Sequence, residues 1–298
     1  MKRNIFVTLL LVVLAIILVG NRVSTVETAA ETNVAYAQNI ENTEEKIETE
    51  PDETETIETE PVETEPLIFD ESITFNVTYV NDGEVMPYAL FEPSSAEDNP
   101  PEHLIVWLHG LGEVSVSEET FLTRGPAGII PSWKLENFNA YIICPHLKGK
   151  YNSKRWSIAT AETNLANLLD KFIEEHNIEK ENISLMGASL GGQGVAYMAV
   201  KMPDYFSRAV VLSGYASIAN MAEIKIPVIG YVGTIGEDSV SIKFMKNTLA
   251  PAIGEEKVKS VEASHADVPK VVFNFDDNGN CRSDVFEWLL GETISEWM

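Results

Sequence analysis

The chain has 298 residues, 46 of them acidic and 21 basic, which gives a formal net charge of −25. This acidity argues against nucleic acid and anionic membrane surfaces as partners, because both repel a negatively charged protein. The two cysteines, Cys144 and Cys281, cannot by themselves fill a tetrahedral zinc shell, and no metal or cofactor is expected.

The first 37 residues are predicted to direct export. Lys2 and Arg3 precede an apolar stretch from residue 5 to residue 19, which is the arrangement of a secretory signal. This stretch is shorter than the roughly 20 residues that span a bilayer. Ala35 and Ala37 form an A-x-A cleavage sequence, although they lie far from the apolar stretch. We therefore expect an exported, secreted or cell-surface protein, with cleavage or retention as an N-terminal membrane anchor left open.

Residues 38–66 are predicted to form an acidic, disordered spacer. Large apolar side chains are almost absent, and Glu-Thr-Glu-Pro occurs at 48–51, 58–61 and 63–66. Like charges at this density repel one another, and the segment has too little apolar surface to form a core. It would either hold a catalytic domain, residues 67–298, away from the cell surface or serve as a neutral leader.

From about residue 67 onward, predicted strands and helices alternate. The period-two pattern of residues 73–80, followed by a turn at 81–83, predicts an antiparallel hairpin with residues 86–91. Short apolar runs typical of buried strands lie at 103–108, 140–144, 183–187, 209–212, 226–232 and 258–261. Helical segments are predicted at 160–176, 190–202, 241–249 and 283–290. This order indicates an α/β fold with a mostly parallel central sheet, helices on both faces and an N-terminal antiparallel hairpin.

The pentapeptide Gly187-Ala188-Ser189-Leu190-Gly191 lies between a predicted strand and a predicted helix. A G-x-S-x-G sequence in this setting is typical of a nucleophile elbow, a sharp turn that exposes the serine at the end of the sheet. A phosphate-binding glycine loop is the alternative, but the G-K-[ST] ending and the G-x-G-x-x-G spacing are both missing. Ser189 is therefore the candidate nucleophile.

A serine nucleophile needs a histidine base, and the base needs a carboxylate that orients it. In this architecture the chain order is serine, acid, histidine, and only His265 of the five histidines follows Ser189. The acid is expected after the strand at 226–232, where Glu237 and Asp238 lie. Asp238 is favoured, and Glu237 is the alternative acid.

An oxyanion hole needs backbone N–H groups that point at the developing negative charge. The first donor is expected from Leu190, the residue after the nucleophile, and the second from the loop after an early strand. His109-Gly110-Leu111-Gly112 follows the strand at 103–108, so the second donor is assigned to Leu111. His109 precedes the serine, so it is expected to be a structural part of this loop.

With these motifs in place, the chain resembles the α/β-hydrolase superfamily over about residues 70–292. It is most similar to secreted esterases of the polyhydroxyalkanoate depolymerase, feruloyl and acetylxylan esterase, and phospholipase/carboxylesterase types. The resemblance is carried by the segments 104–113, 143–146, 155–156, 182–214, 231–238 and 263–269. It implies Ser189, Asp238 and His265 as the triad, although Gly236-Glu237-Asp238 departs from the usual Gly-x-x-Asp pattern. Trp156 is similar in position to a tryptophan near the acyl site, which makes it a substrate contact or else a partly buried loop aromatic.

The function implied is that of a secreted or surface-attached serine esterase that hydrolyses carboxylic esters through an acyl-enzyme. A serine peptidase of the same fold and a non-catalytic surface-binding protein on a hydrolase scaffold are the alternatives. The acidic surface favours a neutral ester, either a small molecule or one linked to a polysaccharide. Residues 113–131 and 147–157 are expected to set specificity, while the oligomeric state and a disulfide between Cys144 and Cys281 stay open.

Overall fold

The computed structural model describes residues 75–135, 138–215, 219–236 and 239–292. By its internal contacts the chain divides into residues 1–66 and 67–298, and every described residue belongs to the second unit. The predicted signal segment, the predicted spacer, and Glu237 and Asp238 lie outside the described residues. Within the described ranges, none of the helices is both long enough and apolar enough to cross a membrane.

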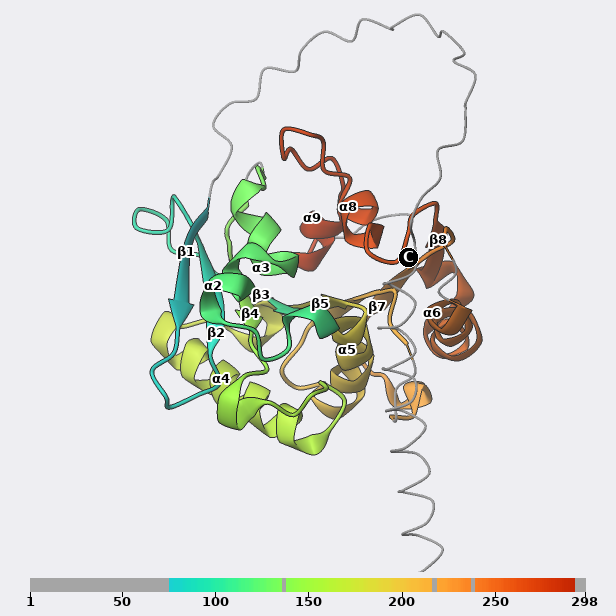
Figure 1. Cartoon of the computed structure of the whole chain (residues 1–298), viewed down its shortest axis with the longest axis horizontal. Coiled ribbons are helices and arrows are strands. Elements are labelled where there is room, and N and C mark those ends of the chain that lie inside the picture. Colours follow the sequence, from blue (N-terminus) through green and yellow to red (C-terminus); the bar gives the residue numbers. More distant parts are fainter. Residues whose placement is uncertain (1–74, 136–137, 216–218, 237–238, 293–298) are drawn as a thin grey trace, which may run out of the picture. The chain divides into compact units, whose positions relative to one another are not determined.

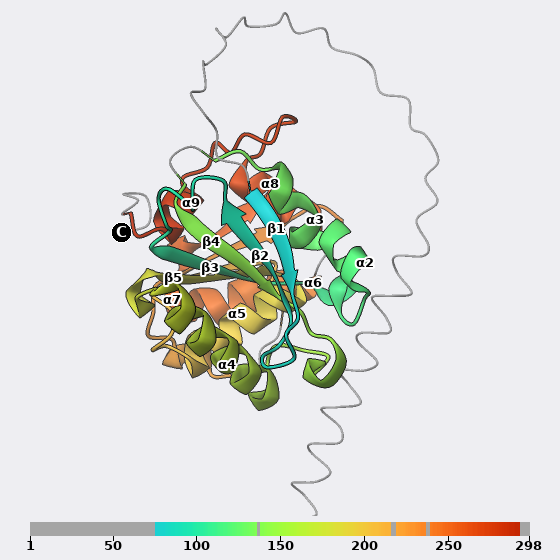
Figure 2. The same cartoon turned by 90° about the vertical axis from the view of Figure 1, so that its left-hand side faces the viewer.

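The centre of the described part is an eight-stranded sheet with the order β1-β2-β4-β3-β5-β6-β7-β8 (Figure 1, Figure 2). β1 and β2 form an antiparallel hairpin, β2 is antiparallel to β4, and the other neighbouring strands are parallel. The predicted α/β class and its antiparallel hairpin are therefore confirmed. The strands are β1 (Phe75–Val80), β2 (Tyr88–Pro93), β3 (His103–Leu108), β4 (Ala140–Pro145), β5 (Ile183–Ala188), β6 (Arg208–Leu212), β7 (Val228–Gly233) and β8 (Val258–Val261).

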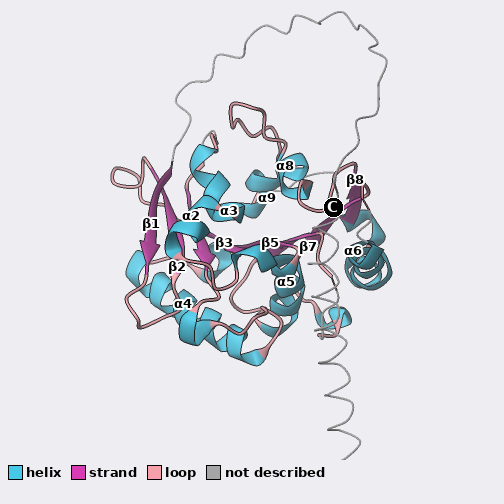
Figure 3. Ribbon diagram, viewed as in Figure 1, coloured by secondary structure: helices cyan, strands magenta, loops and turns pink. Residues whose placement is uncertain are grey.

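Helices cover both faces of this sheet (Figure 3). Helices α2, α3, α8 and α9 lie on one face, and α4 and α5 lie on the other (Figure 1). The helices are α2 (Glu118–Thr123), α3 (Gly125–Ile129), α4 (Ala159–His176), α5 (Leu190–Lys201), α6 (Ser239–Phe244), α7 (Ala250–Ile253), α8 (Val268–Phe273) and α9 (Val285–Leu289). A π-helical turn, Met245–Leu249, joins α6 to α7. Short 3-10 turns lie at Leu111–Glu113, Ile130–Ser132, Gly149–Tyr151, Lys180–Asn182, Met221–Glu223 and Glu255–Lys257.

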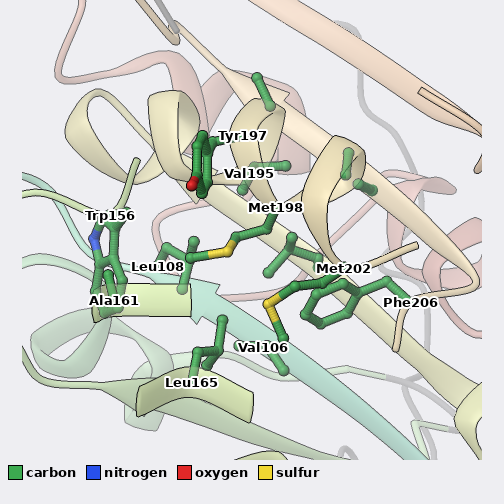
Figure 4. Close-up of a cluster of buried hydrophobic side chains, with 14 of the residues drawn as sticks. Val106, Leu108, Trp156, Ala161, Leu165, Val195, Tyr197, Met198, Met202 and Phe206 are labelled. Carbon is green, nitrogen blue, oxygen red and sulfur yellow. The ribbon is translucent and has the colours of Figure 1, made fainter. Parts of the chain in front are cut away.

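Each face of the sheet has its own apolar core, because successive side chains of a strand point to opposite faces. In β3, Val106 and Leu108 join the core beneath α4 and α5, whereas Trp107 joins the core beneath α8 and α9. Figure 4 shows the first core, in which Leu165 of α4 and Met198 of α5 lie near Val106 and Leu108. Burial on both faces fixes the central strands, and their carboxyl ends position the candidate site.

The structure adds elements that the sequence pattern does not predict. The segment 113–131, expected to be a specificity loop, contains α2 and α3, and the segment 147–157 contains a single 3-10 turn. Helix α2 has one buried residue, Phe121, among its six, so it displays no helical period. The predicted helix at 241–249 begins at residue 239 and passes into the π-helical turn before Pro251, which has no N–H to donate.

The two cysteines are both free thiols. Cys144 is buried in β4, and Cys281 donates a hydrogen bond to the carbonyl oxygen of Phe273 at 2.8 Å. The structure therefore contains no disulfide between them.

Candidate active site

Ser189 lies at the turn between β5 and α5, in the middle of the sheet. Its backbone angles, φ 57° and ψ −118°, are ones that a residue with a side chain rarely adopts. Two hydrogen bonds hold it there: its N–H donates to the carbonyl oxygen of Leu212 at 3.0 Å, and its carbonyl accepts from the N–H of Gln193 at 2.9 Å. The side chain is half-exposed. This is the strained geometry of a nucleophile elbow, as the pentapeptide predicts.

The glycines around Ser189 allow β3, β5 and α5 to approach one another closely. A Cβ on Gly191 would lie 1.8 Å from the carbonyl oxygen of Leu108, and a Cβ on Gly187 would lie 2.7 Å from the same atom. One turn further into α5, a Cβ on Gly194 would lie 2.4 Å from the Cβ of Trp156. Any larger residue at these positions would push the helix away from the end of β3.

The loop after β3, residues 109–113, lies against the elbow. A Cβ built on Gly110 would be 4.0 Å from the Cβ of Ser189 and 3.9 Å from the carbonyl oxygen of Ala188. Leu111 begins the 3-10 turn of this loop, and its side chain is 39% exposed. Leu190 is the first residue of α5. The structure thus places the loop that carries Leu111 against the elbow and Leu190 directly after the nucleophile, and the donor roles of their N–H groups stay predictions.

Trp156 contacts the loop after β3 from the side of the sheet that α4 and α5 cover. Its ring is fully buried, and its indole N–H donates to the carbonyl oxygen of His109 at 3.1 Å. The side chain packs beside α5 and Ala161 of α4 (Figure 4). This placement favours the interpretation of Trp156 as a buried loop aromatic over that of a substrate contact, because the ring has no solvent-exposed surface that a substrate could touch.

His265 lies in the loop after β8, at the same edge of the sheet as Ser189, because parallel strands end at a common edge. Its side chain is half-buried, and its Nδ1 atom is shielded from solvent. The preceding Ala263 accepts a hydrogen bond at its carbonyl from the N–H of Ile235, which ties this loop to the loop after β7. That second loop leads to Glu237 and Asp238, which are outside the described residues. The choice between the two acids therefore stays a prediction.

Three ionisable side chains lie in or beside the loop after β3, namely those of His109, Glu113 and His146, and the sequence pattern singles out only His109. Burial raises the pKa of Glu113, whose carboxylate accepts hydrogen bonds from the backbone N–H groups of Gly110 and of Glu113 itself. Burial lowers the pKa of His109 to about 3 and that of His146 to about 4. Both imidazoles are fully buried, so they are neutral at physiological pH.

The described residues hold no cluster of three or more His, Cys, Asp or Glu side chains that could bind a metal ion. The arrangement at the carboxyl ends of β3, β5 and β8 consists instead of a strained serine, a glycine-containing loop beside it and a half-buried histidine. Such a set can attack a carbonyl group, transfer the proton and stabilise the resulting oxyanion.

Comparisons with known proteins give one family model and several solved structures that are similar to this chain. A model of the family described as "Putative esterase" matches residues 83–222. A solved thermostable esterase is 20% identical, with a TM-score of 0.53, and the match covers 72% of this chain and 62% of that one. The S-formylglutathione hydrolase FrmB from Staphylococcus aureus is 15% identical, with a TM-score of 0.52 and coverage of 76% and 100%. FphF, a fluorophosphonate-binding serine hydrolase of the same species, is 13% identical, with a TM-score of 0.52 and coverage of 74% and 100%. No curated protein sequence matches the chain significantly.

The described part of the chain has the α/β-hydrolase fold, which it shares with these solved structures. The match of residues 83–222 to the esterase family model supports an esterase or a related hydrolase. At this level of identity the solved structures establish the fold, and the activity has to be argued from the site itself.

Proposed function

We propose that the protein is an exported serine esterase that hydrolyses neutral carboxylic esters through an acyl-enzyme on Ser189. His265 is the general base and acid, and Asp238 orients its imidazole, with Glu237 as the alternative acid. The backbone N–H groups of Leu111 and Leu190 form the oxyanion hole. The reaction needs no cofactor, and the acidic surface disfavours anionic substrates.

The reaction proceeds in two halves. His265 removes the proton of the Ser189 hydroxyl as its oxygen attacks the ester carbonyl, and a tetrahedral oxyanion forms. When this intermediate collapses, the C–O bond to the alcohol breaks, and His265 returns the proton to the leaving alcohol. Water then attacks the acyl-enzyme with His265 again as base, and the carboxylic acid leaves as the proton returns to Ser189.

One observation carries this proposal, namely the backbone of Ser189. A positive φ at a serine costs about 1–3 kcal/mol, and the flanking glycines and two hydrogen bonds hold it in place. A binding protein gains nothing from this strain, whereas a nucleophile needs the exposure that the sharp turn provides. Gly110 supports the same interpretation, because a Cβ at its position would lie 4.0 Å from the Cβ of Ser189, which puts the loop after β3 beside the nucleophile.

The test is covalent labelling of the purified protein with a fluorophosphonate, alongside turnover of p-nitrophenyl acetate and butyrate. A fluorophosphonate is an apt probe, since the structurally similar FphF is described as binding this class of compound. Labelling and ester turnover that both disappear in Ser189→Ala would support the proposal. A folded protein that neither reacts nor turns over esters would refute it and favour a surface-binding role.

Peptide substrates in the same assay separate an esterase from a peptidase of the same fold. Turnover of p-nitrophenyl esters with no cleavage of peptide p-nitroanilides is the expected result. Export is tested by expressing the full chain in a bacterial host and sequencing the N-terminus of the protein recovered outside the cytoplasm. An intact N-terminus on membrane-bound protein would indicate an anchor rather than a cleaved signal.

A further inference from the structure

The loop after β4 is bonded directly to the loop after β3 that carries the predicted oxyanion donor. The N–H of Leu147 donates to Nε2 of His109 at 3.2 Å, and the carbonyl of Leu147 accepts from the N–H of Ser115 at 3.0 Å. A third hydrogen bond joins Nε2 of His146 to the carbonyl oxygen of Glu113 at 3.0 Å. Three hydrogen bonds thus join residues 146–147 to both ends of the segment 109–115.

The partners of the two imidazoles determine where their protons lie. A carbonyl oxygen can only accept, so the Nε2 of His146 that faces Glu113 carries the proton, and its Nδ1 accepts from the hydroxyl of Tyr79 at 2.7 Å. A backbone N–H can only donate, so Nε2 of His109 is the acceptor for Leu147. Nδ1 of His109 then carries the proton of this ring and donates it to the carbonyl oxygen of Gly110 at 2.7 Å.

The surroundings of His146 keep this arrangement rigid. Its ring is fully buried and stacks on Phe121 of α2, with 3.9 Å between the ring centroids and an angle of 14° between the planes. Its backbone N–H donates to the carbonyl oxygen of Pro87 at 2.7 Å. Tyr79 reaches it from β1 and packs edge-on against the same ring. The imidazole is therefore held by elements from distant parts of the chain, and its Nε2 proton has one direction in which to point.

We propose that His146 is a positioning residue that sets the oxyanion hole, holding the 3-10 turn Leu111–Glu113 through the carbonyl of Glu113, with Tyr79 selecting the required tautomer. This inference rests on the proposed esterase function, since it assigns Leu111 a role in the transition state. His146 touches neither the substrate nor Ser189. It acts through the backbone of the loop, so its loss displaces an oxyanion donor without removing a catalytic side chain.

The experiment compares two substitutions that preserve different properties of the imidazole. His146→Phe keeps a flat ring that can stack on Phe121 but removes both hydrogen bonds. His146→Gln gives up the ring but places an amide N–H about where Nε2 lies. We expect His146→Phe to lower kcat for p-nitrophenyl butyrate by about 10- to 100-fold, somewhat less than the outright loss of an oxyanion donor. KM should stay within about twofold, and His146→Gln should recover most of kcat.

A transition-state analogue gives a readout that simple destabilisation of the protein would not change. A trifluoromethyl ketone adds to the hydroxyl of Ser189 and forms a tetrahedral oxyanion, so its Ki depends on the oxyanion hole. Across the variants of His146, Ki should rise by the same factor by which kcat/KM falls. A variant whose kcat/KM falls while Ki stays constant would overturn the inference.

Tyr79→Phe tests the tautomer and covers the case in which His146→Phe does not fold. It removes one hydroxyl, so we expect a fall in kcat of about 2- to 10-fold, the worth of a single hydrogen bond. Tyr205→Phe is the matched control, because its hydroxyl donates to a carboxylate oxygen of Asp170 at 2.8 Å on the surface, and it should leave kcat unchanged.

The outcomes also separate the two proposals. An active wild type with unchanged kcat in Tyr79→Phe and in a folded His146→Phe refutes the role of His146 and leaves the esterase proposal intact. A wild-type protein that turns over no ester and takes up no fluorophosphonate refutes the proposed function, and the inference fails with it.

Discussion

Replacing Ser189 with glycine should stabilise the protein while abolishing its activity. Ser189 has φ 57° and ψ −118°, a conformation that brings the Cβ of any side chain into conflict with its own backbone. Glycine has no Cβ and adopts this conformation at no steric cost. The backbone hydrogen bonds to Leu212 and Gln193 involve no side-chain atom of Ser189, so they survive the substitution.

The size of the effect follows from two opposing terms. Relief of backbone strain contributes about 1–3 kcal/mol to stability. Glycine also makes the unfolded chain more flexible, which costs about 0.4–1 kcal/mol. The expected net gain is therefore on the order of 1 kcal/mol, or a rise in Tm of about 2–4 °C for a domain of this size.

Ser189→Ala is the matched control for this prediction. It removes the hydroxyl and thus the activity, but it keeps the Cβ and therefore the strain. Urea unfolding at pH 7, followed by tryptophan fluorescence, measures the free energy of unfolding of all three proteins. A Ser189→Gly protein that is no more stable than Ser189→Ala would refute the claim that the elbow is strained.

Three further predictions concern the acid, the packing and the buried histidines. Asp238→Asn should lower kcat by about 10³- to 10⁴-fold, whereas Glu237→Gln should retain activity, and the reverse result in an ester assay would assign the acid to Glu237. Gly191→Ala should unfold or inactivate the protein, because its Cβ would lie 1.8 Å from a backbone oxygen of β3. Gly112→Ala, with no atom within 4 Å of the new Cβ, should match the wild type in circular dichroism and in urea unfolding. Burial lowers the pKa of His146 to about 4, so this side chain binds a proton more readily in the unfolded chain than in the folded one. The free energy of unfolding should therefore decrease as the pH falls from about 6.5 toward 4, by at most about 1.4 kcal/mol per pH unit. Urea unfolding across this range should give a shallower dependence for His146→Gln, and an identical slope would contradict the lowered pKa.

The sequence predicts the sheet well because burial leaves a strong local signal. Strands covered on both faces are short apolar runs, and β3, β5 and β7 all lie within two residues of their predicted bounds. The short helices α2, α3 and α8 leave no such signal, since five or six residues cannot display a period of 3.6. Two of them fill the segment 113–131, so its folded shape could not be predicted from its composition.

Parts of the candidate site that lie close together in the chain can be predicted from the sequence, whereas contacts between residues far apart in the chain cannot. Ser189 and its glycines form a contiguous motif, and chain order alone leads to His265. Nothing local indicates that the hydroxyl of Tyr79 bonds to an imidazole 67 residues away, or that this imidazole bonds to a carbonyl 33 residues before it. Such pairs depend on the register between strands, which a single sequence does not specify. The resemblance to known esterases suggests Trp156 as a substrate contact, but burial is a tertiary property, and the fold places the ring inside.

The contacts that allow the strained elbow are the same ones that place the oxyanion loop. Gly191 brings α5 against the carbonyl of Leu108, and Gly194 leaves room for Trp156 beside the same helix. Trp156 in turn donates to the carbonyl of His109, one residue after the end of β3. A shift of α5 that relaxed the elbow would therefore move the loop beside it as well. The nucleophile and the oxyanion hole are coupled through this packing, so we expect substitutions at Gly194 to impair catalysis even where the protein still folds.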